Sequence, residues 1–267
     1  MYVFDAHCDY LWMKALKENS NLEKSKNSII KKSIFAVFEG SIPDNELIDT
    51  EIKVFKDKKP VEKTYLAFEG LSWVKSLWDL EKIFKEDPIY VGPMWNNKNE
   101  FGGSCYNDGA LTVFGKCFLE EVDKKGIFID LAHSGEEMFS SCLDNFKNVL
   151  FSHGNVFEVH SHPRNIKRYQ IKKLINHNAF MGLTLYTGFV GERSIHKLFE
   201  HIEYVLDMGG ENTLGFGSDI DGCENLVGTK NGAEVFDEII EEFLKRNYKT
   251  ELIKKILHLN LENCLQK

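Results

Sequence analysis

Five side chains of the types that bind divalent metal ions stand at or just beyond the ends of apolar segments, and they are His7, Asp9, Glu69, His133 and His153. Imidazole nitrogens and carboxylate oxygens together form a ligand set suited to zinc. Five ligands are too many for one tetrahedral zinc ion with an open position, and they suit two ions that share one carboxylate. Two such ions about 3.5–4 Å apart hold a bridging hydroxide at neutral pH and polarise a carbonyl group beside it. The set therefore predicts two Zn²⁺ per chain, at a site that other divalent metals would also fit.

Glu69 is the natural bridge between two metal ions, because a carboxylate has two oxygens whereas an imidazole donates one nitrogen. Judged alone, Glu69 would be interpreted as a helix N-cap or an ion-pair partner. His133 and His153 would each be interpreted as hydrogen-bonded core histidines, and a single H-x-D such as His7-Cys8-Asp9 is weak evidence for a metal. The prediction rests on the complete set.

Asp219 is the candidate for proton transfer, and it ends the apolar run that begins at Thr213. Metal hydrolases need a base that takes a proton from the attacking water and returns it to the leaving amine. The alternative is a turn aspartate, since Asp-Gly pairs mark turns. That alternative suits Asp221-Gly222 better.

Arg164 is the candidate for substrate binding, within the segment His160-Ser161-His162-Pro163-Arg164-Asn165. A guanidinium near an active-site mouth can hold a carboxylate with two parallel hydrogen bonds. The alternative is a surface ion pair. The H-x-H of this segment lies beyond a loop, and we interpret it as structural. Four further histidines fall in predicted helices and are not expected as ligands: His177, His196, His201 and His258.

These residues need a scaffold that brings distant parts of the chain together. Short β-rich runs recur at Tyr2–His7, Ser33–Phe38, Thr64–Phe68, Ile89–Met94, Ile127–Leu131, Val149–Ser152, Phe180–Tyr186 and Thr213–Ser218. Several are continuously apolar, as in strands buried on both faces of a parallel sheet. Helical patterns lie between them, for example from Leu111 to Val122 and from Phe236 to Leu244. Eight strands alternating with helices predict an α/β fold, a (β/α)₈ barrel of the TIM type. An open doubly wound sheet would usually show a glycine-rich phosphate loop after the first strand, where this chain has His7-Cys8-Asp9.

The C-terminal ends of barrel strands face the active-site mouth, and the candidate residues fall at those ends. Trp95 and Tyr186 follow predicted strands as well and are expected at the mouth. His7 and Asp9 should point to the same side, because residues i and i+2 of a strand share a face. The polar, lysine-rich segment Asn19–Lys32 is expected to be a solvated loop or a frayed helix. Since no repeat or composition break divides the chain, we expect one hydrolase barrel domain over residues 1–267.

Composition excludes several classes of protein. The chain has 267 residues, of which 43% are hydrophobic and 28% charged, with a formal net charge of -8. These values are typical of a globular protein and not of a disordered or collagenous chain. No apolar run reaches the ~20 residues of a membrane span, and no secretory signal is recognised at the N-terminus. We therefore expect a cytoplasmic protein that binds neither membranes nor, being acidic, nucleic acid. The six cysteines form no C-x-x-C and are expected to be free thiols.

Several motifs together resemble the membrane dipeptidase (renal dipeptidase) family of zinc metallopeptidases, and the pattern is similar to that of short bacterial members. The matching stretches are FDAHCD, AFEG, GALTVFG…LEEVDKKGIFIDLAHS, LFSHGN…HPRN and GFGSDIDG. They occur in family order between residues 4 and 222, and several ordered motifs are far more specific than any one of them.

The resemblance implies a (β/α)₈ barrel with two zinc ions. It implies that His7 and Asp9 bind one metal, that His133 and His153 bind the other, and that Glu69 bridges them. It also implies that Asp219 transfers the proton. Arg164, together with Tyr186, would hold the C-terminal carboxylate of the substrate.

One departure from the family concerns the fourth strand. Mammalian relatives end it with a histidine thought to contact the scissile carbonyl, whereas this chain has Pro93-Met94-Trp95-Asn96. Tryptophan cannot coordinate a metal, and its only polar group is an N–H donor. We expect Trp95 to bind no metal and to shape specificity. Without the histidine, either hydrolysis of simple dipeptides is slow or another donor substitutes for it, and the indole could instead form an apolar wall that favours aromatic or aliphatic side chains. Asn96, Asn97 and Asn99 are the nearest replacement donors. The chain is also short for the family between its early strands, where loops govern specificity.

The sequence thus predicts a metal-dependent dipeptidase, a hydrolase that cleaves dipeptides, including those with a C-terminal D-residue. One alternative is a related barrel amidohydrolase that acts on another small amide. The other is a non-catalytic metal-binding barrel. The expected partner is a small dipeptide substrate, and a homodimer is left open.

Overall fold

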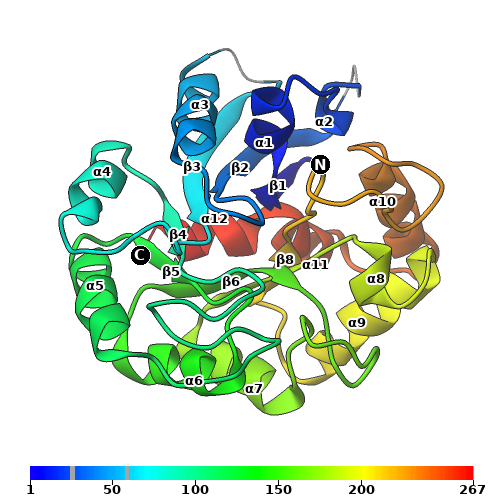
Figure 1. Ribbon diagram of the computed structural model, residues 1–267. Helices are drawn as coiled ribbons and strands as arrows, with labels where there is room; N and C mark the ends of the chain where they lie inside the picture. Colours follow the sequence, from blue (N-terminus) through cyan, green and yellow to red (C-terminus); the bar gives the residue numbers. More distant parts are fainter. Residues whose placement is uncertain (25–27, 58–59, 267) are drawn as a thin grey trace.

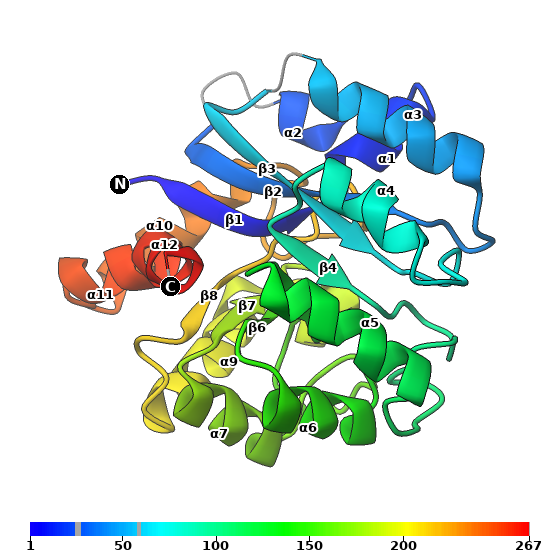
Figure 2. The ribbon, with the colours of Figure 1, turned by 90° about the vertical axis from the view of Figure 1, so that its left-hand side faces the viewer.

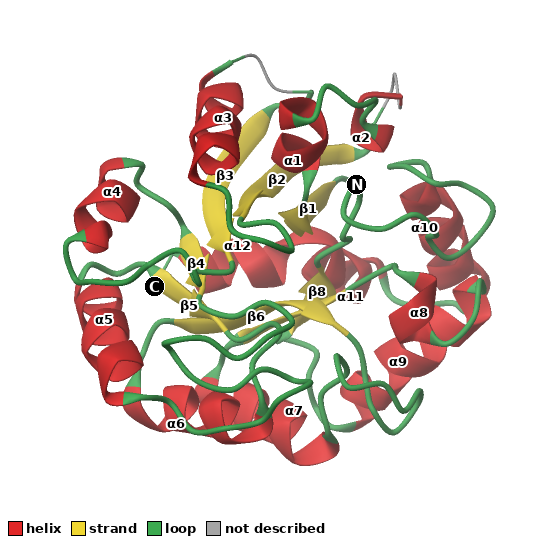
Figure 3. Cartoon of the chain, in the orientation of Figure 1, coloured by secondary structure: helices red, strands yellow, loops and turns green. Residues whose placement is uncertain are grey.

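The computed structural model describes residues 1–24, 28–57 and 60–266. Within these ranges, eight parallel strands follow one another around one sheet in chain order. Helices surround the strands on the outside (Figures 1 and 3). The strands are β1 (Val3–Cys8), β2 (Ile30–Phe38), β3 (Lys63–Glu69), β4 (Tyr90–Gly92), β5 (Phe128–Asp130), β6 (Val149–Gly154), β7 (Phe180–Leu183) and β8 (Leu214–Phe216). The predicted (β/α)₈ barrel is confirmed.

The sheet closes on itself between β8 and β1. Cys8 forms a parallel bridge with Ile220. The backbone N–H of Asp219 donates to the carbonyl of His7 at 3.1 Å, and the N–H of Asp9 donates to the carbonyl of Ile220 at 3.0 Å. The closing contacts therefore run through the residues that carry three of the candidate site side chains.

The helices from α1 to α9 connect successive strands, the helices from α10 to α12 follow β8, and most of them cover the outside of the barrel. They are α1 (Tyr10–Ala15), α2 (Asn21–Lys24), α3 (Asn45–Lys56), α4 (Asp79–Lys85), α5 (Val113–Lys124), α6 (Glu136–Asn145), α7 (Arg168–His177), α8 (Thr187–Val190), α9 (Ile195–Asp207), α10 (Val235–Lys245), α11 (Thr250–Lys254), the π-helical turn η1 (Lys255–Leu259) and α12 (Asn260–Leu265). Short polar side chains begin several of them. Asp44 caps α3, Thr112 caps α5 and Ser194 caps α9, each accepting from a backbone N–H of the first turn. None of the helices in the described ranges combines the length and apolarity that crossing a bilayer requires.

The apolar core has two parts. The larger part lies between the strands and the surrounding helices. The smaller part fills the inside of the barrel and includes Phe4, Ile34, Tyr90, Phe128, Leu150 and Phe180. Leu261 and Cys264 of α12 pack into the same cluster. Figure 2 shows α12 at the end of the barrel where β1 begins. This end is therefore plugged, and the C-terminal ends of the strands form the open mouth.

All eight predicted strands are present, and the main differences lie at their ends. The second strand begins at Ile30, which pairs with Val3 of β1. The prediction of a loop or frayed helix for Asn19–Lys32 is therefore wrong at its C-terminal end, while α2 covers Asn21–Lys24 and residues 25–27 lie outside the described residues. The seventh strand ends at Leu183, so Tyr186 follows it by a short turn. Both predictions differ from the structure because pairing with neighbouring strands decides where a strand begins and ends, and composition does not report that pairing.

Candidate active site and metal centre

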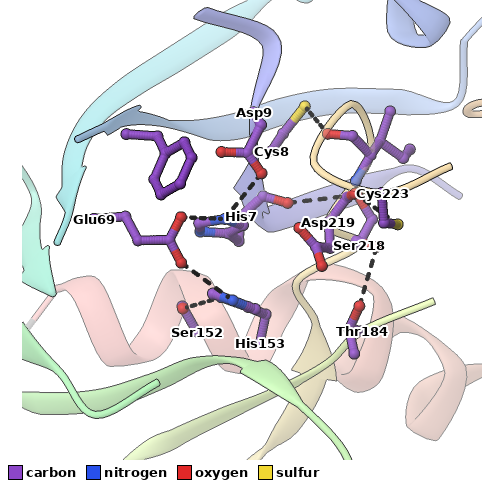
Figure 4. Close-up of polar contacts among 12 residues, drawn as sticks. His7, Cys8, Asp9, Glu69, Ser152, His153, Thr184, Ser218, Asp219 and Cys223 are labelled. Carbon is purple, nitrogen blue, oxygen red and sulfur yellow. Dashed lines mark hydrogen bonds and ion pairs between the residues drawn. The ribbon is translucent and has the colours of Figure 1, made fainter. Parts of the chain in front are cut away.

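The five predicted metal ligands meet at the open mouth of the barrel. His7, Glu69 and His153 lie in β1, β3 and β6, while Asp9 and His133 follow β1 and β5. All five residues are at most 6% exposed. Figure 4 shows His7, Asp9, Glu69 and His153 pointing toward one another. Residues that are far apart in the sequence thus form one buried polar cluster.

Glu69 stands at the centre of this cluster. Its Oε2 lies 3.5 Å from Nε2 of His7. Its Oε1 lies 2.9 Å from Nε2 of His133 and 3.4 Å from Nε2 of His153. The two oxygens of one carboxylate therefore face two different sets of nitrogens, which is the arrangement of a bridging ligand.

The ligand atoms fall into three overlapping groups, in each of which the atoms lie within 4.8 Å of one another. One group is His7, Asp9 and Glu69, and a second is Glu69, His133 and His153. Asp219 forms the third group with His7 and His153. Nε2 of His7 also lies 3.3 Å from Oδ2 of Asp9, although Asp9 stands beyond the end of β1, at the N-cap position of α1.

Hydrogen bonds on the far side of each imidazole direct its Nε2 into the cluster. The Ser152 hydroxyl donates to Asp130, so it accepts from Nδ1–H of His153 at 2.7 Å. The Tyr90 hydroxyl donates to the carbonyl of Ala6 and therefore accepts from Nδ1–H of His7 at 2.9 Å. Outer partners of this kind fix the tautomer of metal-binding histidines.

The third imidazole is held in the same way. Nδ1 of His133 lies 3.2 Å from Oδ1 of Asn96, an acceptor, so the proton resides on Nδ1. Burial lowers the pKa of His133 and of His153 well below the usual value. Both rings are therefore neutral, with the Nε2 lone pair free to bind a cation.

Two strands carry one extra residue where they present a histidine to the mouth. Between Asp5 and Cys8 the chain has two residues, whereas the paired stretch of β2, from Ser33 to Phe35, has one. The same mismatch occurs in β6 between Phe151 and Gly154, opposite β7. A bulge re-aims a side chain, and these irregularities contain His7 and His153.

His133 and Asp219 adopt left-handed backbone conformations, with φ of 65° and 63°. Non-glycine residues rarely take such values, and strain of this kind collects at functional sites. Gly222 lies against the same region, because a Cβ there would come within 2.1 Å of Oδ2 of Asp9 and 2.4 Å of Oδ1 of Asp219. Asp221 instead faces α2, where it accepts from Ser20 and Asn21.

A cavity of about 520 Å³ opens above the cluster. The predicted substrate-binding residues Arg164, Tyr186 and Trp95 all line it, as does Asp219. Among the replacement donors, Asn96 lines the cavity, whereas the side chain of Asn99 is engaged with the backbone of Pro93 and Phe101. Asn97 is exposed and lies outside the lining.

Arg164 is buried, and none of the described carboxylates forms an ion pair with it. Only 2% of the residue is exposed, and its guanidinium packs over the ring of Phe189 at 5.2 Å. Nη2 donates to the carbonyl of His153 at 3.3 Å, while Nε has no hydrogen-bond partner in the described part of the chain. An unpaired buried charge is costly, so this guanidinium is suited to bind an anion that enters the cavity.

The model of the family described as membrane dipeptidase (peptidase family M19) matches residues 46–267 of this chain. The chain belongs to this family. The resemblance identified from its motifs is thereby confirmed.

Among known proteins, this M19 chain is similar to Dipeptidase tcpJ of Claviceps purpurea (strain 20.1). The two are 23% identical over 232 residues, which cover 82% of this chain and 53% of the relative. The chain thus spans about half the length of that curated relative.

Two solved structures share the fold of the M19 chain. One is dipeptidase AC, a metallo peptidase of family M19, with a TM-score of 0.89, 18% identity and coverage of 100% of this chain and 98% of that chain. The other is a metallo peptidase from Rhodobacter sphaeroides liganded with a phosphinate mimic of the dipeptide L-Ala-D-Ala. Its TM-score is 0.88, with 17% identity and coverage of 100% of this chain and 99% of that chain.

The M19 cluster favours additional positive charge. Burial raises the pKa of Glu69 to about 8 and that of Asp219 to about 7, and the nearby charge of Asp9 contributes to both shifts. Burial alone would lower the pKa of His7, but the negative charges of Glu69 and Asp9 outweigh it and raise the pKa to about 10. The site thus stabilises a cation at Nε2 of His7.

Two buried aspartates that support the M19 site were missed by the sequence analysis. Asp5 accepts from the N–H and the hydroxyl of Ser218, and Asp130 accepts from the N–H and the hydroxyl of Ser152. Each aspartate thus links two neighbouring segments of the barrel that lead to site residues. Asp5 links β1 to the segment after β8, and Asp130 links β5 to β6. The signal was an acidic residue inside an otherwise apolar strand, where an unpaired carboxylate would be costly.

Several cavity-lining residues were also missed, among them Trp12, Phe38, Tyr106 and His162. Phe38 ends β2, so the rule that strand ends face the mouth would have found it. His162 belongs to the H-x-H assigned to a structural purpose, and its Nδ1 accepts from the N–H of Arg164 at 3.1 Å. The four helix-borne histidines lie outside the cavity lining of the described residues: His177, His196, His201 and His258.

Proposed function

We propose that residues 1–267 form one metal-dependent hydrolase domain that cleaves dipeptides at a binuclear zinc centre. The observation that carries the proposal is the position of Glu69, whose two oxygens face His7 on one side and His133 with His153 on the other. Membership of the membrane dipeptidase family supports the same reaction.

The residues present fit a pair of divalent cations. Nε2 of His7 and Oδ1 of Asp9 are buried without a hydrogen-bond partner in the described chain. His133 and His153 present unprotonated Nε2 atoms, and Nε2 of His7 attracts positive charge. His7 and Asp9 would hold one ion, His133 and His153 the other, and Glu69 both. When bound, the ions supply a hydroxide nucleophile at neutral pH and polarise the scissile carbonyl.

Asp219 would move the proton. Its carboxylate lies within 4.8 Å of the ligand atoms of His7 and His153 and lines the cavity. From this position an Oδ atom of Asp219 would accept a proton from the attacking water and return it to the leaving amine. The closure contact between the N–H of Asp219 and the carbonyl of His7 fixes this position.

Arg164 and Tyr186 would bind the free carboxylate of the substrate. The guanidinium of Arg164 is buried at the cavity wall and has no carboxylate of the described chain as partner. A substrate carboxylate that pairs with it in two parallel hydrogen bonds would be oriented with its peptide carbonyl over the cluster. A carboxylate clamp in the same cavity as the cluster favours dipeptides over longer chains. The phosphinate mimic of L-Ala-D-Ala in the related Rhodobacter enzyme makes dipeptides with a C-terminal D-residue part of the proposal.

The test is a substrate panel with the zinc-reconstituted protein. The panel contains L,L- and L,D-dipeptides, the same dipeptides with C-terminal amides, tripeptides, and N-acyl amino acids. Asp219→Asn serves as the inactive control. The proposal is supported if the wild type hydrolyses free dipeptides and the control does not. Cleavage of N-acyl amino acids alone would assign a different amide substrate, and absence of hydrolysis with metal bound would leave a binding barrel.

A further inference from the structure

The side of the cavity across from Arg164 is aromatic. The rings of Trp12 and Phe38 lie 5.0 Å apart between centroids and meet at 64°. Phe38 and Trp95 also lie 5.0 Å apart and meet at 61°. Trp95 continues the row to His133, at 6.3 Å. We call Trp12, Phe38 and Trp95 the aromatic wall. All three line the cavity and are half-buried, so each presents a ring surface to its interior.

The aromatic wall and Arg164 stand on opposite sides of the metal ligands. Phe38 ends β2, whereas Arg164 is anchored to the carbonyl of His153 in β6. In the strand order β1 to β8, β2 and β6 are four strands apart and so face each other across the barrel. Glu69 at the centre of the cluster lies between these two sides.

We propose that the aromatic wall is the subsite for the side chain of the amino-terminal residue, and that it selects aromatic and large aliphatic residues there. The inference rests on the proposed function. A dipeptide whose carboxylate pairs with Arg164, and whose scissile carbonyl lies over Glu69, directs its amino-terminal side chain across the mouth toward Phe38 and Trp95.

The chemistry of the wall sets the preference. Aromatic rings make edge-to-face contacts with another ring and bury aliphatic side chains. Their faces carry negative partial charge, so an aspartate or glutamate side chain is disfavoured there. A glycine at the amino-terminal position has no side chain to bury against the wall, so it gains no binding free energy there.

The wall is preformed, which increases selectivity. The N–H of Phe38 donates to Oε2 of Glu51 at 2.9 Å. The ring of Trp12 packs closely over Gly40, where an added Cβ would lie 3.5 Å from it. A substrate side chain therefore meets rings that already have contacts within the protein, which lowers the entropic cost of ordering them on binding.

The experiment measures kcat/KM of the zinc-loaded protein for Phe-Ala, Leu-Ala, Gly-Ala and Asp-Ala. We expect Phe-Ala and Leu-Ala to exceed Gly-Ala by about tenfold or more, as burial of an apolar group of this size gives, and Asp-Ala to be poorest. In Phe38→Ala and Trp95→Ala, the ratio of kcat/KM for Phe-Ala to kcat/KM for Gly-Ala should fall toward one. Zinc content, measured on the same samples, should stay at the wild-type value.

Two controls separate a subsite from general damage. Trp78→Ala removes a tryptophan that is 82% exposed and lies outside the cavity lining, and it should keep the wild-type ratio. The ratio of Ala-Phe to Ala-Gly reports the other side of the peptide bond and should not follow the Phe-Ala ratio. If dipeptides are hydrolysed but the wild type does not favour Phe-Ala, or if the wall variants change only the Ala-Phe ratio, the subsite assignment is overturned. Absence of hydrolysis of every dipeptide would overturn the proposed function and the subsite with it.

Discussion

The Nε2 atoms of His133 and His153 lie 3.2 Å apart. Both rings keep their proton on Nδ1, His133 toward Asn96 and His153 toward Ser152. Two bare nitrogens at this separation, both also within 3.4 Å of one Glu69 oxygen, have no proton between them. Such a concentration of lone pairs is stable around a cation.

The first prediction concerns metal content. Protein purified without chelator, or reconstituted with zinc, should contain about two divalent ions per chain in elemental analysis. Removing them should also lower the melting temperature, because ions bound only to the folded state stabilise it by mass action. A content near zero with no uptake on titration would contradict the binuclear centre.

The second prediction concerns Asp219. Asp219→Asn keeps the size of the side chain and removes its basic oxygen, so it should lower kcat by about 10²–10⁴-fold. Metal content should remain at the wild-type level. Near wild-type kcat in the variant would assign proton transfer to another group.

The third prediction concerns Arg164. Arg164→Ala should reduce kcat/KM for free dipeptides by about 30–5000-fold, the range expected when one partner of a buried charge pair is removed. Dipeptide amides, which lack the carboxylate, should lose much less. Arg164→Lys retains the positive charge but lacks the two parallel N–H donors of the guanidinium, so its kcat/KM should fall between those of the wild type and Arg164→Ala. A melting curve for each variant checks folding, and equal losses for acids and amides would show that Arg164 does not bind the carboxylate.

The fourth prediction concerns Ser152, which orients His153 without touching substrate. Ser152→Ala removes the acceptor for Nδ1–H and should weaken zinc binding by about 10–100-fold. Ser33→Ala is the matched control, because Ser33 is also buried in a strand and its hydroxyl has no hydrogen-bond partner in the described residues. Competition with a zinc chelator measures both variants. Equal affinities would mean that His153 is oriented by packing alone.

The fifth prediction concerns Glu51, a fully buried carboxyl on α3. Burial raises its pKa from 4.5 to about 9, so folding takes up a proton at neutral pH. The protonated form stabilises the fold fully below about pH 4.5, and that contribution is lost as the pH rises toward 9. The difference in unfolding free energy between the wild type and Glu51→Gln should therefore shift in favour of the variant by a few kcal/mol, as an order of magnitude, between pH 5 and 9. Urea unfolding at several pH values measures this, and parallel pH profiles would contradict it.

The barrel and most of the candidate cluster could be predicted from the sequence, because both depend on local pattern. Eight apolar runs separated by helical patterns specify strands buried on both faces, and a parallel barrel turns the C-terminal end of every strand to one side. Residues such as Glu69 and His133 then had to meet, whatever the details of packing.

Only the tertiary structure decided how these side chains are aimed. His7 reaches the cluster through an extra residue in β1, and its tautomer depends on Tyr90, 83 positions away in the chain. Asp5 finds its partner Ser218 213 positions away, across the closing seam of the barrel. The aromatic wall is assembled from helix α1, the last residue of β2 and the segment that follows β4. Strand pairing and barrel closure create these contacts between residues with no local relation, and a sequence read along its length carries no signal of which distant side chain will stand opposite.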